Sequence, residues 1–265
     1  MVELFHVTHR AGGATLLDDV SVAFRENKFN VIVGPNGAGK STLMRIASGL
    51  MRPSSGMVKY LAEEISSLSR EALARRRAVL SQNVELAFAL TVEDVVLLGR
   101  FPHYGATPAE ADWRIVSRTL EEIGLVDKRK QPYPTLSGGE KQKVQLARVL
   151  AQIWRDDDSS EDHRVLFLDE PVTGLDVHYQ IHILDSARAM LDSGCTVIAV
   201  LHDLNLAFDY ADAAFVMNRG KVVLETDNAR DISSSLIEEV FNVAVRQVGA
   251  GESAHMWRFM RKDSP

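Results

Sequence analysis

A glycine-rich run near the start of the chain carries the strongest chemical signal. Its residues are Gly34, Pro35, Asn36, Gly37, Ala38, Gly39, Lys40 and Ser41, with Thr42 directly after it. Glycines remove side chains, so backbone N–H groups can surround phosphate oxygens, while a lysine reaches the outer phosphates and a serine hydroxyl meets magnesium. The apolar run 29–33 predicts a strand before the loop, and the spacing of Leu43, Ile46, Ala47 and Leu50 predicts a helix over 40–50. The sequence therefore predicts a phosphate-binding loop at a helix N-terminus.

Two acidic residues follow a second apolar run, 165–168. They are Asp169 and Glu170. Sheets of α/β proteins bind ligands at the carboxyl ends of their strands, so we expect Asp169 to hold magnesium and Glu170 to polarise an attacking water. Taken alone, such a pair is more often a solvated strand end, and it becomes informative only beside a phosphate loop.

A second glycine pair precedes a helical pattern over 137–154. Ser137, Gly138 and Gly139 leave backbone N–H groups free at the start of this helix, which favours anion binding. The plain alternative is a capped helix start, because Ser137 with Glu140 fits a capping box. Thr91 with Asp94 fits the same pattern ahead of another helix.

Charge and cysteine usage limit the classes of protein that fit. The 265 residues carry a formal net charge of −6, which argues against a nucleic-acid partner. The single cysteine, Cys195, lies in the apolar run 195–201 and is expected in a core strand, so no disulfide forms within the chain. Neither a signal peptide nor an apolar run of about 20 residues is visible, so we expect membrane contact only through a partner.

The order of the remaining patterns predicts an α/β fold. Alternation predicts half-buried strands over 2–9 and 20–24, and the segment 213–226 predicts a hairpin turning at Asn218-Arg219-Gly220. Helical patterns occupy 91–99, 108–124 and 137–154, and a further helix is expected over about 177–193. The acidic run 155–164 is expected to be a solvated loop, and Trp257 and Phe259 indicate one last strand.

With these residues in this order, the chain resembles the ATP-binding-cassette ATPases. Residues 136–140 match the signature motif of that family, and residues 173–176 match its D-loop. Gln82, after the expected strand 78–81, corresponds to the Q-loop glutamine, and His202 corresponds to the switch histidine. The resemblance implies a RecA-like phosphate-loop core with an antiparallel β subdomain, over 1–82 and 161–265, and an inserted α-helical subdomain over 83–160.

The resemblance also implies a composite site in a homodimer. ATP on the loop of one copy is covered by Ser137, Gly138, Gly139 and Asp176 of the other. Magnesium is held by Ser41, Gln82 and Asp169, and the catalytic residues are Glu170, His202 and Gln82. The adenine contact is expected at His9, where the family usually has an aromatic residue, or at Arg10. Val172 stands where Thr or Ser is commoner, and little effect is expected.

Within the family, the run Gly99-Arg100-Phe101-Pro102-His103 is typical of importers of siderophores, cobalamin and haem. Residues 135–154 and the acidic insertion look most similar to the haem importers; siderophore or cobalamin import is the alternative. The resemblance implies two copies of a membrane permease, indirectly a substrate-binding protein, and a place on the cytoplasmic face of the inner membrane. No histidine of this chain is expected to ligate haem. Other classes considered are a non-transport cassette ATPase and a phosphate-loop kinase of metabolites.

Overall fold

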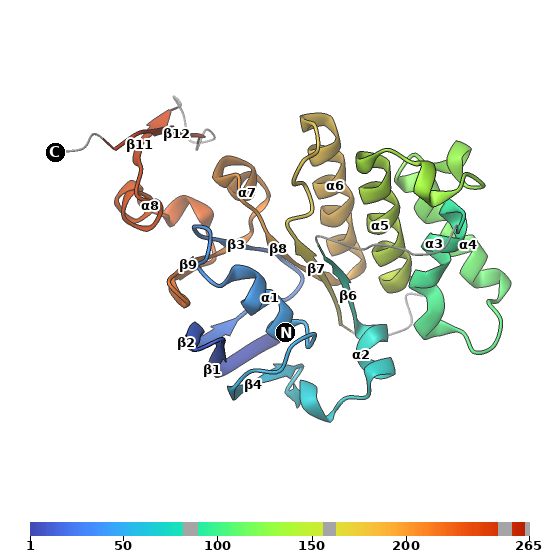
Figure 1. Cartoon of the computed structure of the whole chain (residues 1–265), viewed down its shortest axis with the longest axis horizontal. Helices are drawn as coiled ribbons and strands as arrows, with labels where there is room; N and C mark the ends of the chain where they lie inside the picture. The colour runs from blue at the N-terminus through green and yellow to red at the C-terminus, as the bar shows by residue number, and fades with distance from the viewer. Residues whose placement is uncertain (82–89, 156–162, 249–255, 263–265) are drawn as a thin grey trace. The chain divides into compact units, whose positions relative to one another are not determined.

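The computed structural model describes residues 1–81, 90–155, 163–248 and 256–262. These residues form two compact units (Figure 1). The first unit joins residues 1–66 to 198–265, and the second covers 67–197. Within the described ranges, no helix combines the length and apolar character needed to cross a membrane. The subdomain boundaries predicted at 83 and 160 stay a prediction.

The first unit contains an antiparallel sheet with strand order β2-β1-β4-β5. Its strands are β1 (Val2–Ala11), β2 (Ala14–Ala23), β4 (Ser55–Tyr60) and β5 (Glu63–Glu64). The strand predicted over 2–9 is confirmed, but its alternation is interrupted: Val2 and Leu4 are buried, and an irregularity at His6, with φ of 48°, shifts the buried side so that Val7 is buried next. This sheet is the antiparallel β subdomain.

The same unit contains the strand that leads into the phosphate loop, β3 (Phe29–Val33), which is buried throughout. It pairs in parallel with β9 (Ala213–Asn218), and β9 forms an antiparallel hairpin with β10 (Lys221–Thr226). Arg219 and Gly220 have φ of 47° and 78°, as a two-residue hairpin turn requires. The hairpin predicted at this turn is therefore confirmed.

Three helices and a terminal hairpin complete the first unit. They are α1 (Lys40–Ala47), α7 (Leu204–Tyr210), α8 (Ser234–Phe241), β11 (Ala244–Val248) and β12 (Met256–Met260). The helix predicted over 40–50 ends at Ala47, because Gly49 adopts a φ of 70° and its N–H bonds to the Ile46 carbonyl, at 2.9 Å. Leu50 consequently lies outside the helix and is 52% exposed, so its predicted place on the apolar face is wrong.

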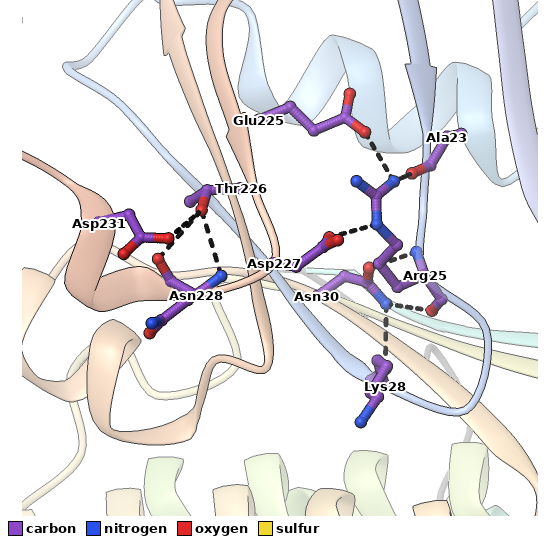
Figure 2. A network of polar contacts seen from close by, with 9 residues as sticks. All are labelled: Ala23, Arg25, Lys28, Asn30, Glu225, Thr226, Asp227, Asn228 and Asp231. Atoms are coloured by element: carbon purple, nitrogen blue, oxygen red, sulfur yellow. Dashed lines mark hydrogen bonds and ion pairs between the residues drawn. The ribbon is translucent and has the colours of Figure 1, made fainter.

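A polar network fixes the connection that delivers β3 (Figure 2). Arg25, just after β2, donates to Asp227 through Nε and to Glu225 at 2.6 Å through Nη1. Asn30 of β3 accepts from the Arg25 N–H at 2.6 Å, and its amide donates to the carbonyls of Arg25 and Lys28 at 2.8 and 3.0 Å. The network ties the turn before β3 to the end of β10, although some 200 residues separate them in sequence.

The second unit combines a short parallel strand pair with the helices. Its elements are α2 (Arg70–Arg76), β6 (Arg77–Leu80), α3 (Val92–Leu97), α4 (Glu110–Glu122), α5 (Gly138–Ile153), β7 (Arg164–Asp169) and α6 (Val177–Ala189). β6 and β7 pair in parallel, and α3 and α4 both pack against α5 (Figure 1). Thr91 caps α3 and Ser137 caps α5, each in a capping box, as predicted.

The fully buried strand β8 (Cys195–Val200) crosses the boundary between the two units in sequence. Cys195 is buried there, and burial raises the pKa of its thiol to about 12, so the cysteine is an inert core residue as predicted. The α/β class, the antiparallel sheet and the inserted helices all agree with the expected fold.

Candidate nucleotide site

Tight packing at the end of the phosphate loop sets where α1 begins. Gly39 caps this helix with a φ of 100°, a backbone conformation that other residues rarely adopt. A Cβ atom at this position would lie 2.7 Å from the Leu16 carbonyl oxygen in β2. Any larger residue would therefore push the loop away from the antiparallel sheet.

Lys40 is buried in the loop, with 5% of its surface exposed. Its ammonium donates to the carbonyls of Gly34 and Pro35, at 2.8 and 3.0 Å, so the charge is held against the loop backbone. A buried cation is stabilised by an anionic partner. This charge, together with the N–H groups in the first turn of α1, fits the phosphates of a nucleotide.

His202 follows β8 on the strand edge beside the loop. The Leu201 N–H donates to the carbonyl of Ile32, two residues before Gly34, at 3.3 Å. His202 is exposed and lines a hollow of about 350 Å³ with the start of α7 and with Phe241, Val243 and Phe259. Within the first unit, the structure thus places His202 close in space to the strand that feeds the phosphate loop.

Another helix start and the C-terminal strand flank His202. Asp203 caps α7 by accepting from the N–H groups of Asn205 and Leu206, at 2.9 and 3.1 Å. The Asn205 amide donates to the Trp257 carbonyl at 3.1 Å and accepts from the Trp257 N–H at 2.7 Å. This two-way bond to β12 was not predicted from the sequence, because the two residues lie 52 positions apart.

His9 lies half-buried in β1, opposite Leu17 of β2. The Leu17 side chain in turn faces the position of Gly39, so His9 is one strand away from the loop. Nδ1 of His9 is buried and has no hydrogen-bond partner among the described residues. Arg10 is exposed, and its N–H donates to the Ser54 hydroxyl at 3.0 Å. The adenine contact at either residue stays a prediction.

In the second unit, β7 delivers the acidic pair as predicted. Its residues are buried up to Leu168, and Asp169 and Glu170 are half-buried at its end. Glu170 has a φ of 54°, a strained conformation for a residue with a side chain, and such strain often accompanies function. The Thr173 N–H donates to the Glu170 carbonyl at 3.4 Å and steadies this bend.

The same unit brings the predicted D-loop together with the start of α5. The Gln142 amide donates to the Thr173 carbonyl at 3.0 Å, and a Cβ atom at Gly139 would lie 3.3 Å from the Leu175 side chain. Asp176 caps α6 by accepting from the Tyr179 N–H at 3.1 Å. The first turn of α5, the D-loop and the acidic pair therefore form one connected surface. Gln82, the remaining predicted site residue, lies outside the described residues.

The run 99–103 has a structural role that the sequence did not reveal. Arg100 is buried and pairs with Asp112, Nε to Oδ1 at 3.0 Å, and its Nη1 donates to the carbonyls of Ala151 and Trp154 at 2.7 and 2.9 Å. Nε2 of His103 lies 2.7 Å from the Gln152 carbonyl oxygen. A Cβ atom at Gly99 would lie 2.0 Å from the Arg148 carbonyl oxygen. Glycine, arginine and histidine together fasten the turn Leu98–His103 to the end of α5.

A hollow of about 780 Å³ beside this turn is strongly cationic. Asp112 supplies the one carboxylate among the residues that line this hollow. The lining arginines are Arg75, Arg76, Arg100 and Arg155. Burial, followed by the Arg100 charge, lowers the pKa of His103 to about 4, so this histidine is neutral at pH 7. Phe101 projects from the same turn and is 67% exposed.

Comparison with known proteins agrees with this arrangement. The family model described as ABC transporter matches residues 17–173. The hemin import ATP-binding protein HmuV of Bradyrhizobium diazoefficiens is 40% identical over 243 residues, covering 92% of this chain and 89% of its own. The protein of the same name from Agrobacterium fabrum is 42% identical over 243 residues, covering 92% of each.

Solved structures share the fold. An inward-facing metal-chelate type ABC transporter superposes with a TM-score of 0.78 at 21% identity, covering 98% of this chain and 96% of its own. A dimeric ATP-binding cassette bound to ADP and Pi, in a post-hydrolysis state, gives a TM-score of 0.73 at 26% identity, covering 86% of this chain and 98% of its own. The chain belongs to the ABC transporter family, as one of its ATP-binding cassette ATPases.

Proposed function

We propose that this chain hydrolyses ATP to drive import of haemin through a membrane permease. The choice of haemin as substrate is supported by the relatives named as hemin import ATP-binding proteins. One of them, from Rhodopseudomonas palustris, is 43% identical over 88% of this chain. The buried Lys40 at the helix start supports nucleotide binding. Import of a ferric siderophore or cobalamin is the alternative reading of residues 99–103.

Each part of the site takes a distinct role in this proposal. Lys40 and the N–H groups of residues 34 and 36–42 hold the β- and γ-phosphates. Asp169 and the Ser41 hydroxyl are oxygen donors that suit Mg²⁺, with Gln82 as the third ligand, and Mg²⁺ would neutralise charge on the phosphates. Glu170 orients or deprotonates the attacking water, and His202 contacts the γ-phosphate. His9 is the proposed adenine contact.

Two copies of the chain would complete the site. Ser137, Gly138 and Gly139 lie at a helix start whose N–H groups suit an anion, and Asp176 lies on the same surface. We infer that these residues cover ATP held on the loop of a second copy. Hydrolysis is then coupled to closure of the pair, because neither copy alone completes a site. The dimeric cassette bound to ADP and Pi supports this pairing.

The permease is proposed to dock on the turn Leu98–His103. The inward bonds of Arg100 and His103 leave Phe101 as an exposed aromatic side chain beside the cationic hollow. A cytoplasmic permease segment with an apolar side chain flanked by acidic ones would complement this surface in apolar character and in charge. Two permease copies, a substrate-binding protein outside the membrane, and a place at the cytoplasmic membrane face complete the proposed assembly.

Transport by the reconstituted complex tests the substrate. The chain and its permease are placed in proteoliposomes, with the substrate-binding protein loaded with haemin, a ferric siderophore or cobalamin in separate samples. We expect haemin alone to raise the rate of phosphate release and to accumulate on the far side. Stimulation by a siderophore or cobalamin, with haemin inactive, would replace haemin as the substrate and keep the ATPase role.

A further inference from the structure

The first turn of α5 carries a carboxylate where the proposed function requires affinity for an anion. Glu140 is the third residue of this helix, directly after the pair Gly138 and Gly139. Its Oε2 accepts from both the Ser137 hydroxyl and the Ser137 N–H, at 2.8 Å each. Glu140 thereby fixes Ser137, but its negative charge offsets the positive potential that this helix end would offer to a second anion.

The charge of Glu140 is not needed for this capping. A capping box accepts glutamine as readily as glutamate, because the side-chain oxygen is the group that accepts the bonds. A carboxylate at the site of a γ-phosphate repels that phosphate, since like charges at short range cost free energy. A cation beside the carboxylate would reduce this repulsion.

Lys128 supplies that cation from a separate element. It ends the short helical turn Val126–Lys128 after α4, and its Nζ pairs with Oε1 of Glu140. Backbone bonds hold the lysine in place: its N–H donates to the Leu125 carbonyl at 3.1 Å, and its carbonyl accepts from the Gln131 N–H at 2.8 Å. The Lys128 bond is the largest influence that lowers the pKa of Glu140, to about 2, so the carboxylate stays ionised at physiological pH.

The cationic side chains near Lys128 and Glu140 contact other partners. Arg129 and Lys130, next in sequence, both pair with Glu93 of α3. On α5 itself, Lys141 lies over the Tyr133 ring at 6.0 Å, and Lys143 lies over the Tyr179 ring at 3.8 Å. Among the described residues, Lys128 is the cation in direct contact with Glu140.

We propose that Lys128 is a positioning residue that neutralises Glu140, so that Ser137 and the first N–H groups of α5 can receive the γ-phosphate of ATP held by a second copy. This inference rests on the proposed pairing of two chains. The ion pair keeps the capping geometry that orients Ser137, and it removes the repulsion that an uncompensated carboxylate would exert on the phosphate. Lys128 itself acts through Glu140 and is not a ligand of the nucleotide.

The test is a double-mutant cycle on the chain reconstituted with its permease, with ATP turnover measured against MgATP concentration. Lys128→Met should raise KM for ATP about three- to tenfold, because Glu140 is left uncompensated. Glu140→Gln alone should hold KM at or below the wild-type value. The double variant Lys128→Met with Glu140→Gln should return KM to within about twofold of wild type.

A matched control and a salt series separate charge from folding. Lys130→Met removes the same charge two residues away, and Arg129 still pairs with Glu93, so its KM should stay at the wild-type value. The ratio of KM in Lys128→Met to KM in the wild type should fall as salt is raised from about 0.05 M to about 0.5 M, since ions screen an exposed charge. A purely structural defect would show neither rescue nor salt dependence.

Either of two results would overturn the proposal: an unchanged KM in Lys128→Met, or a double variant as impaired as Lys128→Met alone. A wild-type complex that turns over ATP without moving haemin would overturn the proposed substrate only. KM for ATP could still be compared among the variants in that complex. Failure of the proposed role of Lys128 and failure of the proposed substrate are therefore distinguishable.

Discussion

Glu170 carries its carboxylate on a backbone that few glutamates adopt, with φ at 54° directly after β7. The Thr173 hydroxyl lies 3.5 Å from Oε2 of Glu170, so the side chain faces the segment that follows the strand. Glu170→Gln keeps the size of the side chain but removes the base. We expect ATP binding to persist while the rate of phosphate release falls about 10²- to 10⁴-fold, the usual contribution of a general base.

The same Glu170 variant should accumulate as a closed dimer with ATP, which size-exclusion chromatography with and without nucleotide would detect. Glu122→Gln, at the exposed end of α4, is the matched control and should leave turnover unchanged. Near-normal turnover in Glu170→Gln would remove this residue from the catalytic role.

The bonds of Arg100 stabilise the helices of the second unit, and we expect no role for its side chain in binding a ligand. Arg100→Leu would leave the Asp112 carboxylate buried without its partner and would remove the donor to the carbonyls of Ala151 and Trp154. Breaking a buried pair in this way costs about 3–5 kcal/mol. Urea unfolding should show a loss of that size, since the variant keeps the rest of the core.

The exposed pair of Arg114 and Glu110 on α4 provides the comparison for Arg100. Arg114→Leu should change the free energy of unfolding by less than about 1 kcal/mol, because surface ion pairs contribute little. Equal losses in the two variants would mean that Arg100 has no special structural role.

At the scale of the element, the turn Leu98–His103 should make the stability depend on pH. The His103 pKa is lowered to about 4, below the ordinary 6.5, so the unfolded chain binds the proton more readily between these values. The contribution of His103 is complete above pH 6.5 and is lost as the pH falls toward 4. His103→Gln should flatten this part of the profile, by about 1–2 kcal/mol after allowance for solvent screening.

Urea titrations of both proteins at pH 7 and pH 5 give the measurement for His103. The comparison between the variant and the wild type cancels the contributions of the other histidines. An identical change in stability between the two pH values in both proteins would contradict the lowered pKa.

Elements with local signals were predictable, and those defined by distant partners were not. The capping boxes at Thr91 and Ser137 and the turn at Arg219 each involve residues within a few positions of one another. Leu50 misled the helix prediction because hydrophobic spacing continued past the point where Gly49 ends the helix. Asp112, the ion-pair partner of Arg100, lies 12 positions away, and the carbonyls that accept from Arg100 lie 51 and 54 positions away, so no local pattern could reveal these bonds.

The residues of the candidate site could also be predicted where the signal is local, and their contacts could not where they depend on distant partners. The phosphate loop, the acidic pair and the helix start at Ser137 could be placed from local motifs, because each lies at the end of one element. The contact of Gln142 with Thr173 and the pairing of Lys128 with Glu140 depend on how elements pack. The sequence therefore predicted the candidate residues, whereas the structure shows which contacts hold those that it describes.

For the whole molecule, coupling to the permease should depend on Phe101. Phe101→Ala removes the exposed aromatic ring without touching a buried contact of the core. We expect the permease to co-purify less with this variant and the proposed haemin transport to fall, while the isolated chain binds ATP as before. Val223→Ala, an exposed apolar position on β10, should leave co-purification intact. Retention of the permease by Phe101→Ala would exclude this docking face.

The chain order of the first unit has a consequence for biosynthesis. Residues 1–66 leave the ribosome before residues 198–265, yet the two segments belong to the same compact unit. The neighbour of β3 on one side is β9, and the Asp227 that clamps Arg25 emerges later still. During translation, the apolar strand that carries the nucleotide loop must wait with an open edge, exposed to aggregation. Newly made chains should therefore depend on chaperones until the last quarter has been synthesised.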